Sequence, residues 1–415
     1  MRWRATQQAS FWRSKSKHVS NAIIVINSGS TSLKFGVYRL DEGGEPALIC
    51  RGDIDEMETA PAFVVKSHDD KPLATHEWGE GHAIDHAQAL TFVINWLESN
   101  VRGLRVVGAG HRIVLGGTRY KAPTLIEGDV LDYLDELSVM EPSHQPYNVG
   151  GARAMAKVFG HLPQVGCFDT SFHRTMPDVA QVYAVPAEVH ARGVQHWGYH
   201  GISYDYISRQ LKKRAPEARR VIVAHLGGGA SMCAMLDGRS IDTSMGFAGL
   251  SGLPMATRTG DLPPEIVFYL LRTKAYDLES LEKLLYHKSG LLGLSGISSD
   301  MRTLLANKSP EAARAVEYFI YQVVRYAGAY AAVLGGLDAF VFTAGIGENA
   351  VPIRRAVCQR LGFLGIELDD AVNSRHGPRI STSASKVSVW VIPTNEELMI
   401  ASHTIAVLRA SGLLK

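Results

Sequence analysis

Runs of apolar residues, some continuous and some alternating with polar ones, predict a three-stranded meander near the start of the chain. The continuous run Ala22–Ile26 predicts a buried strand. Apolar and polar residues alternate over Leu33–Leu40, which predicts a second strand with one buried face, and Ala47–Cys50 predicts a third. A polar turn, residues 27–32 (NSGSTS), joins the first two strands.

The same pattern returns in the middle of the chain. The run Val221–Ala224 is followed by three consecutive glycines at 227–229, then by Ser231–Leu236, an Asp-Gly hairpin signal at 237–238, and Ser240–Thr243. The order of strand, polar or glycine turn, strand, tight turn and strand therefore occurs twice and predicts an internal duplication. Because glycines expose backbone N–H groups to close approach by an anion, we expect one phosphate-facing hairpin in each half.

Helical spacing and further buried runs account for most of the remaining chain. The spacing of apolar residues predicts helices over Ile84–Leu97, Gly151–Val158 and Tyr204–Arg214, the last of them capped at Ser203. Continuous apolar runs predict buried strands at Leu104–Ala109, Gln164–Phe168, Asp338–Thr343 and Val387–Ile392.

Several signals toward the C-terminus mark helix starts. Ser309 followed by Pro310 predicts the start of a long helix. The strand that ends at Thr343 runs into a glycine-containing turn, residues 344–349 (AGIGEN), and then into a helix, an order that aims a helix N-terminus at an anion. Residues 395–397 (NEE) begin the terminal helix.

The composition is that of an ordinary soluble protein with room for two or three domains. The 415 residues are 46% hydrophobic and 20% charged with a net charge of +2, so there is no basic footprint for nucleic acid or an anionic membrane. The four cysteines lie far apart, which argues against a disulfide framework or a cysteine metal site and favours a cytoplasmic location. Residues 1–20 carry five Lys or Arg and no acid, and we interpret them as a flexible basic tail.

Common catalytic motifs are absent from the sequence. It holds no GxxxxGK[ST], HExxH or GxSxG, but three glycine turns follow strands, which suggests a nucleotide held between two halves. His82 and His86 lie four residues apart and could share a metal, but a solvated helix start is the favoured interpretation.

Ten short motifs, taken in order, resemble the acetate kinases over nearly everything from residue 22 to 415. They are NSGSTSLKFGVY, GHRIVLGG, CFDTSFHRTMP, GYHGIS, HLGGGAS, DTSMGFAGL, TRTGD, SDMR, TAGIGEN and PTNEEL. The resemblance implies two duplicated actin-like (ribonuclease H-like) α/β domains with the active site in the cleft between them. We expect an N-terminal acyl-substrate and magnesium domain over 21–170 plus 397–415, and a nucleotide-binding domain over 171–396. The family moves the γ-phosphoryl group of ATP reversibly onto acetate, giving acetyl phosphate and ADP. It uses Mg²⁺, with Mn²⁺ able to substitute, and forms homodimers.

The resemblance also implies roles for five catalytic residues. Arg112 would orient the acyl carboxylate and Arg258 would stabilise the transferring group, since a guanidinium binds such oxygens bidentately and stays charged. His200 would hydrogen-bond the phosphoryl group in the transition state, and His144 matches a second, less critical histidine. Asp169 would hold an arginine or help to place Mg²⁺, because a carboxylate substrate is already ionised and needs no general base.

Further positions match the binding sites of the family. Asn27 and Glu396 match its magnesium-linked positions. The residues that match its ATP-binding segments are Ser30, Ser32, Lys34, His225, Leu226, Gly227, Gly228, Gly229, Asp300, Met301, Arg302, Gly345, Ile346, Gly347, Glu348 and Asn349. Those that match its acyl pocket are Arg112, Val114, Ser143, Tyr199 and Gly249.

This chain departs from the family pattern at five positions near these sites. Leu115 stands where His is usual, Ser143 replaces Leu, Tyr199 replaces Phe, Gly249 replaces Pro and Gly228 replaces Asn. Loss of apolar surface at about 25 cal/mol per Å² predicts a roomier or more polar acyl pocket, in which propionate or another short acid competes with acetate. Three alternatives remain: another carboxylate kinase such as a butyrate kinase, a non-kinase ATPase of the same superfamily, and a degenerate binding protein.

Overall fold

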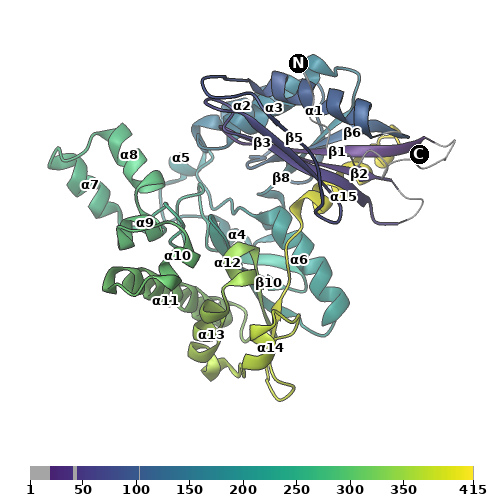
Figure 1. Ribbon diagram of the computed structural model, residues 1–415. Coiled ribbons are helices and arrows are strands. Elements are labelled where there is room, and N and C mark those ends of the chain that lie inside the picture. Colours follow the sequence, from purple (N-terminus) through teal and green to yellow (C-terminus); the bar gives the residue numbers. More distant parts are fainter. Residues whose placement is uncertain (1–18, 41–43, 102, 415) are drawn as a thin grey trace. The chain divides into compact units, whose positions relative to one another are not determined.

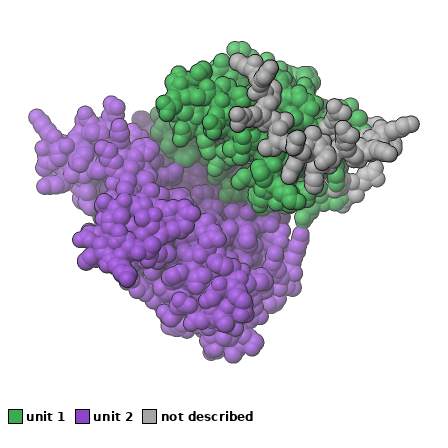
Figure 2. Space-filling model, in the orientation of Figure 1, with its two compact units in different colours: residues 1–171, 395–415 green, residues 172–394 purple. Residues whose placement is uncertain are grey.

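The computed structural model describes residues 19–40, 44–101 and 103–414. The basic tail expected over residues 1–20 lies outside them except for its last two residues. The chain divides into two compact units (Figure 2). The first, unit 1, ends at Ser171 and also includes the C-terminal segment from Asn395, and the second, unit 2, is Phe172–Thr394. The expected domain boundaries differ from these by one residue at the first junction and by two at the second.

Unit 1 is built on a mixed sheet of order β5-β4-β3-β2-β1-β6-β8-β7. Strands β1 to β5 form an antiparallel meander, whereas β6 and β8 run parallel to β1. Their bounds are β1 Ser20–Ser28, β2 Leu33–Arg39, β3 Ala47–Asp55, β4 Ala62–Ser67, β5 Pro72–Glu77, β6 Leu104–Ile113, β7 Thr124–Leu125 and β8 Gln164–Phe168.

Helices cover both faces of this sheet (Figure 1). Ala109 of β6 belongs to the core that includes α1 (His86–Asn100) and Met155 of α3 (Gln145–Val158). Its neighbour Gly110 faces the opposite way, because successive strand residues alternate between faces, and meets the terminal helix α15 (Glu396–Ala410). A Cβ at Gly110 would overlap Thr404 Oγ1 and lie 2.8 Å from Ile400 Cγ2, so glycine allows α15 to approach β6 closely. The short α2 (Val130–Glu136) packs beside α3.

Unit 2 repeats the central part of this topology. Its sheet has the order β11-β10-β9-β12-β13, with bounds β9 Arg220–Leu226, β10 Ala230–Leu236, β11 Arg239–Thr243, β12 Ala339–Thr343 and β13 Ser388–Val391. Strands β9, β10 and β11 form an antiparallel meander, and β12 and β13 run parallel to β9. Unit 1 has the same arrangement in β3-β2-β1-β6-β8, so the predicted duplication is confirmed.

The helices of unit 2 vary widely in length. The longest, α11, begins at Pro310 as predicted, and its N-cap Ser309 accepts a hydrogen bond from the backbone N–H of Ala312. The others are α4 Asp178–Gln181, α5 Ala187–His190, α6 Gly201–Arg214, α7 Pro264–Arg272, α8 Leu278–His287, α9 Gly290–Ser295, α10 Met301–Ala306, α12 Ala344–Asn349, α13 Val351–Arg360 and α14 Asp370–Ser374, and α11 extends to Val333.

Three helix starts differ from the predictions. Helix α6 is preceded by His200 in the left-handed conformation, with φ 58°, and the expected cap Ser203 turns its hydroxyl to His225 and Thr394 instead. Helix α3 begins at Gln145, six residues before the predicted start, with Pro146 in its first turn. The expected turn over 344–349 is itself the short helix α12, so the turn contracts to Ala344, which has φ 64°.

The four cysteines are buried free thiols. None of the helices in the part of the chain that the structure describes is long and apolar enough to cross a membrane.

Candidate active site

Three predicted site residues of unit 1 stand at the carboxyl ends of adjacent parallel strands. Ile26 of β1 pairs with His111 of β6, so the next residues, Asn27 and Arg112, lie side by side. Strand β8 pairs with β6 and ends at Phe168, directly before Asp169. Ligands bind to α/β sheets at the carboxyl ends of parallel strands, so this edge is the natural place for a site.

Arg112 lies between two carboxylates. Its Nε and Nη2 both donate to Asp169 Oδ2 at 2.9 Å, and its Nη1 lies 3.3 Å from Glu396 Oε2. The side chain of Asp169 is 1% exposed, whereas those of Arg112 and Glu396 are each 19% exposed. Glu396 was expected in the second domain, but it is the first residue of α15, which packs on β6 and β8 and so belongs to unit 1.

The charges in this cluster shift one another's pKa values. Burial raises the pKa of Asp169 to about 6, Arg112 and His144 oppose that rise, and Glu396 adds to it. Burial works to lower the pKa of Arg112, but Asp169 and Glu396 together hold this pKa above its usual range. Arg112 is therefore charged throughout, and Asp169 is mainly ionised at neutral pH.

Two buried amide side chains at the start of α3 hold the strand ends that carry these residues. Asn148 accepts from the backbone N–H of Val114 at 3.1 Å and donates to the carbonyl of Ser28 at 2.7 Å, so it ties β6 to β1. Gln145 accepts from Leu115 N–H at 3.1 Å and donates to its carbonyl at 3.0 Å. Neither residue was predicted, because their partners lie 30 or more residues away in the chain and leave no local signal in the sequence.

His144 directly precedes α3 and lies in a polar cluster with the predicted pocket residue Ser143. Its Nδ1 lies 2.8 Å from Ser143 Oγ and 3.1 Å from Glu141 Oε1. His144 is close enough for its charge to lower the pKa of Asp169. The structure therefore brings His144 and Ser143 to the same region of unit 1 as Arg112.

The first hairpin of unit 1 presents its predicted phosphate-binding residues outward. Ser30 and Lys34 are exposed and Ser32 is half-buried. The turn closes through the backbone N–H of Gly29, which donates to the carbonyl of Ser32 at 2.8 Å. His86, considered above as a metal ligand, instead contacts the carbonyl of Gly29 with its Nε2 at 3.0 Å.

In unit 2, His200 and His225 stack as parallel rings with centroids 4.2 Å apart. His200 Nδ1 lies 2.8 Å from Ser231 Oγ, and the hydroxyl of Tyr204 lies 2.5 Å from the same Oγ. The opposite ring nitrogen, Nε2, faces Gly229, where a Cβ would lie only 3.3 Å away. The left-handed backbone and the hydroxyl together aim His200 at the glycine loop, a strained arrangement of the kind found at functional sites.

The glycine loop between β9 and β10 is compact and open to solvent. Gly227 N–H donates to the carbonyl of Gly229 at 3.1 Å, and the carbonyl of Gly228 accepts from Ala256 N–H at 3.0 Å. Gly228 is exposed, and no atom lies within 4 Å of the place that its Cβ would occupy. Leu226, by contrast, is a buried residue at the end of β9.

Arg258 lies in the Gly- and Thr-rich segment after β11. Its Nη1 donates to the carbonyl of Gly249 at 2.7 Å, which links it to one of the predicted pocket positions. Tyr199 is buried and donates its hydroxyl to the carbonyl of Phe247 at 2.9 Å. The segment that holds Phe247 and Gly249 therefore contacts the side chains of both Tyr199 and Arg258.

Helix α12 holds residues 345–349 and is supported by a buried guanidinium. Arg354 is fully buried and donates to the carbonyls of Gly347 at 3.0 Å and Glu348 at 2.7 Å. Glu348 Oε1 accepts from the N–H groups of Ala344 and Thr394, so this residue closes the start of the helix. Arg354 was not predicted, because an arginine after a helix start usually lies on the surface.

The predicted nucleoside residues 300–302 begin α10. Asp300 is the N-cap and accepts from the backbone N–H of Arg302 at 2.7 Å. The guanidinium of Arg302 contacts the same carboxylate at 2.5 Å and is exposed, and it holds the pKa of Asp300 down to about 2. Met301, which lies between them in the sequence, is buried.

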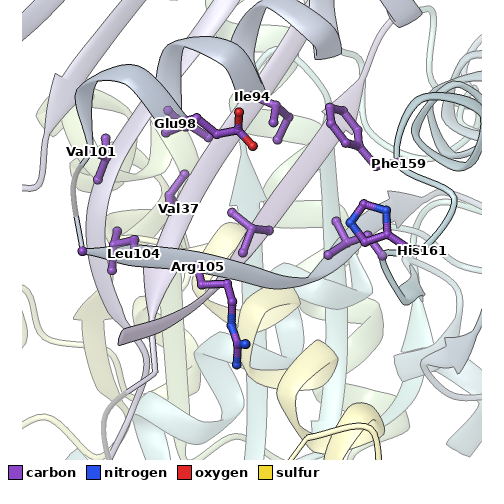
Figure 3. Close-up of a pocket in the computed structure, with 12 residues that line it drawn as sticks. Val37, Ile94, Glu98, Val101, Leu104, Arg105, Phe159 and His161 are labelled. Atoms are coloured by element: carbon purple, nitrogen blue, oxygen red, sulfur yellow. The ribbon is translucent and has the colours of Figure 1, made fainter. Parts of the chain in front are cut away.

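A cavity of about 610 Å³ in unit 1 lies apart from all of these residues (Figure 3). Apolar side chains such as Val37, Ile94 and Phe159 line it, with Glu98 and Arg105 among them, and none of the predicted site residues does. The candidate site is therefore defined by strand ends and loops and not by this cavity.

Among the described residues, no group of three or more His, Cys, Asp or Glu side chains could by itself hold a metal ion. The Oδ1 atom of Asp169 is buried without a hydrogen-bond partner in the described structure. An oxygen ligand of this kind near Glu396, on the same sheet edge as Asn27, fits Mg²⁺, which is held by one or two carboxylates with waters and phosphates as further ligands.

Comparison with known proteins identifies the family. A model of the acetokinase family matches residues 22–402. A protein named acetate kinase from Rhodopseudomonas palustris is 46% identical over 391 residues, covering 93% of this chain and 98% of the relative. The crystal structure of Porphyromonas gingivalis acetate kinase is 32% identical with a TM-score of 0.84, covering 94% of this chain and 100% of the other. That of a propionate kinase from Francisella tularensis is 34% identical with a TM-score of 0.85, covering 92% and 99%. These likenesses confirm the predicted α/β fold class, and the chain belongs to the acetokinase family.

Proposed function

We propose that this chain is an acetate kinase, which transfers the γ-phosphoryl group of ATP reversibly to acetate and forms acetyl phosphate and ADP. The observation that carries the proposal is Arg112, held by Asp169 and Glu396 at the carboxyl ends of parallel strands in a chain of this family. Several curated relatives named acetate kinase, against one propionate kinase among the solved structures named above, favour acetate as the substrate.

In this proposal unit 1 binds the acceptor. Arg112 orients the carboxylate of acetate, since its charge is secured by two acidic neighbours. Acetate is ionised at neutral pH, so Asp169 positions Arg112 and does not act as a general base. When Mg²⁺ is bound, it neutralises charge on the phosphates, and Asp169, Glu396 and Asn27 are the residues that would hold it.

Unit 2 supplies the groups for the nucleotide and for the transferring phosphoryl group. The glycine loop offers backbone N–H donors, and Asp300 to Arg302 and α12 hold the nucleoside and the adjoining phosphates. Transfer is direct and in line, so catalysis rests on positioning and charge neutralisation. His200 donates a hydrogen bond from Nε2 to the phosphoryl oxygens, and Arg258 stabilises their charge.

The test is formation of acyl phosphate, trapped as the hydroxamate, from ATP and a panel of short acids. We expect product with acetate as the best acceptor, ADP release only when a carboxylate is present, and loss of at least about 100-fold in kcat for Arg258→Ala. ATP hydrolysis without an acceptor would indicate a non-kinase ATPase, and an Arg258→Ala variant with full turnover would refute the assigned role of Arg258.

We also propose that the protein is a cytoplasmic homodimer whose interface includes helix α7. The sequence of this helix is PEIVFYLLR, yet none of its residues is buried, and Ile266, Phe268 and Tyr269 are 40%, 51% and 64% exposed. An apolar face of this kind is typical of an interface. Phe268→Glu should give a monomer in light scattering, whereas Val139→Glu, which alters an 85% exposed residue of unit 1, should not. A Phe268→Glu variant that keeps the mass of the wild type would exclude this interface, and a monomeric wild type would exclude the dimer.

A further inference from the structure

We propose that Glu141 is a positioning residue for His144. It holds the imidazole by its Nδ1–H so that Nε2 serves the acceptor side of the reaction. The inference rests on the proposed acetate kinase function, and it adds a residue that the family motifs did not single out. No pattern in the sequence had drawn attention to Glu141.

Glu141 is buried where an ionised carboxylate without hydrogen-bond partners would be unstable. It is 1% exposed, and a buried carboxylate is stable only when hydrogen bonds replace its lost hydration. Its Oε1 contacts both Ser143 Oγ and His144 Nδ1, the latter at 3.1 Å. Ser143 Oγ lies 2.8 Å from the same Nδ1, so a carboxylate, a hydroxyl and a ring nitrogen converge.

The hydrogen bonds among Glu141, Ser143 and His144 fix the tautomer and the orientation of the His144 ring. An ionised carboxylate only accepts hydrogen bonds, so His144 donates to it from Nδ1–H. A histidine whose Nδ1–H is held by a carboxylate has one ring orientation and one tautomer, and the opposite nitrogen is directed away from the carboxylate. Gln145, the next residue, bonds to Leu115, so the ring stands in the same part of unit 1 as Arg112 and its partner Asp169.

The backbone here is secured without the Glu141 side chain. His144 stands just before α3, and its side chain makes no helix-capping bond. The start of α3 is tied to the rest of unit 1 by Gln145 and Asn148, through Leu115, Val114 and Ser28. Removal of the Glu141 carboxylate should therefore release the imidazole and leave the helix in place.

The experiment is a double-mutant cycle on acetyl phosphate formation. We expect Glu141→Ala to lower kcat about tenfold, by analogy with the 10- to 100-fold cost of removing the hydrogen-bond partner of a metal-ligating histidine, with KM for ATP unchanged. Glu141→Gln keeps a hydrogen-bond acceptor and should recover part of this loss. In a His144→Ala background, Glu141→Ala should change kcat less than twofold, because its target is gone.

A second readout does not depend on activity. In ¹⁵N-histidine spectra, the resonances that vanish in His144→Ala should show an Nδ1-protonated ring in the wild type and a mixture of tautomers in Glu141→Ala. The control is Glu136→Ala, which removes an exposed carboxylate five residues upstream and should alter neither measurement.

Additive losses in the double mutant, or an unchanged tautomer in Glu141→Ala, would overturn the positioning role. If Glu141→Ala does not fold, Glu141→Leu, which fills a similar volume but has no acceptor, carries both tests. If the wild type makes no acyl phosphate, the proposed function fails, and the tautomer measurement still decides the role of Glu141.

Discussion

Replacement of Asp169 by Asn should make the protein more stable and much less active. Asn has the shape of Asp and keeps an oxygen that can accept from Arg112, but it carries no charge. Asp169 is 1% exposed, with one carboxylate oxygen bonded twice by Arg112 and the other without a partner in the described structure. The substitution therefore isolates the effect of a buried negative charge.

The effect on stability follows from the pKa of Asp169. This pKa is 3.8 for an ordinary Asp and about 6 in the folded protein, so the folded state binds the proton more tightly. The free energy of unfolding therefore falls as pH rises from about 4 to about 6, and the loss stays constant at higher pH. A difference of about two pKa units at 1.36 kcal/mol each amounts to about 3 kcal/mol. Asn, which resembles the protonated acid, should avoid this cost.

The effect on activity has the opposite sign. Without the charge of Asp169, Arg112 keeps only the 3.3 Å contact with Glu396 among its two acidic partners. An Arg112 that is no longer held in place stabilises the charge of the reacting groups less well. Loss of one such electrostatic contact typically lowers kcat about 100- to 1,000-fold, so kcat/KM for acetate should fall by a similar factor.

Urea unfolding of both proteins between pH 4.5 and pH 8, in EDTA and without nucleotide, measures the stability prediction. The variant should gain about 1 to 3 kcal/mol over the wild type at pH 8 and about a third of that gain at pH 4.5. A variant that is less stable than the wild type at pH 8, or a difference that does not change with pH, would show that Arg112 compensates the charge fully. The reasoning from burial would then be wrong.

Three other changes test separate features. Gly228→Asn restores an amide at an exposed position with open space around it, so KM for ATP should fall; an unchanged KM in steady-state kinetics would mean that backbone donors suffice. Gly110→Ala should lower the free energy of unfolding by about 1–3 kcal/mol because the added methyl group pushes α15 away from β6. The control Gly150→Ala, in open space on α3, should raise the free energy of unfolding by about 0.4–1 kcal/mol. Equal urea midpoints for the two variants would refute this prediction. His144→Asn should move the acid limb of the kcat profile upward, because the charge of His144 lowers the pKa of Asp169; an unmoved limb would refute that coupling.

The sequence predicts the fold well wherever local patterns decide it. Alternating and continuous apolar runs located both meanders, and their repeat revealed the duplication, because sheet strands leave a strong periodic signal. Helix starts were less predictable. Ser203 resembles a cap, but its hydroxyl bonds to His225 and Thr394, two partners that only the folded chain brings near.

Sequence motifs proposed the residues of the candidate site, but not the contacts that support them. Arg112 and Asp169 follow predicted strands, so their meeting could be expected. The clamp by Asn148 and the support of α12 by Arg354 depend on contacts far apart in the chain, for which a single sequence has no local signal. The return of the terminal helix to the first domain was expected from residue 397, but unit 1 resumes at Asn395, so Glu396, the first residue of α15, also belongs to unit 1.

The cluster of Arg112, Asp169 and Glu396 carries more negative than positive charge, so an anionic substrate would need a further cation here. Arg112 brings one positive charge, whereas Asp169 and Glu396 bring two negative ones, so the cluster alone repels an arriving carboxylate and phosphate. A divalent cation bound to Asp169 Oδ1 would reverse that balance at this edge of the sheet of unit 1. Burial removes the hydration that would stabilise the ionised carboxylate of Asp169, and this raises its pKa. The ionised carboxylate is nevertheless placed to bind Arg112 through Oδ2 and a metal ion through Oδ1.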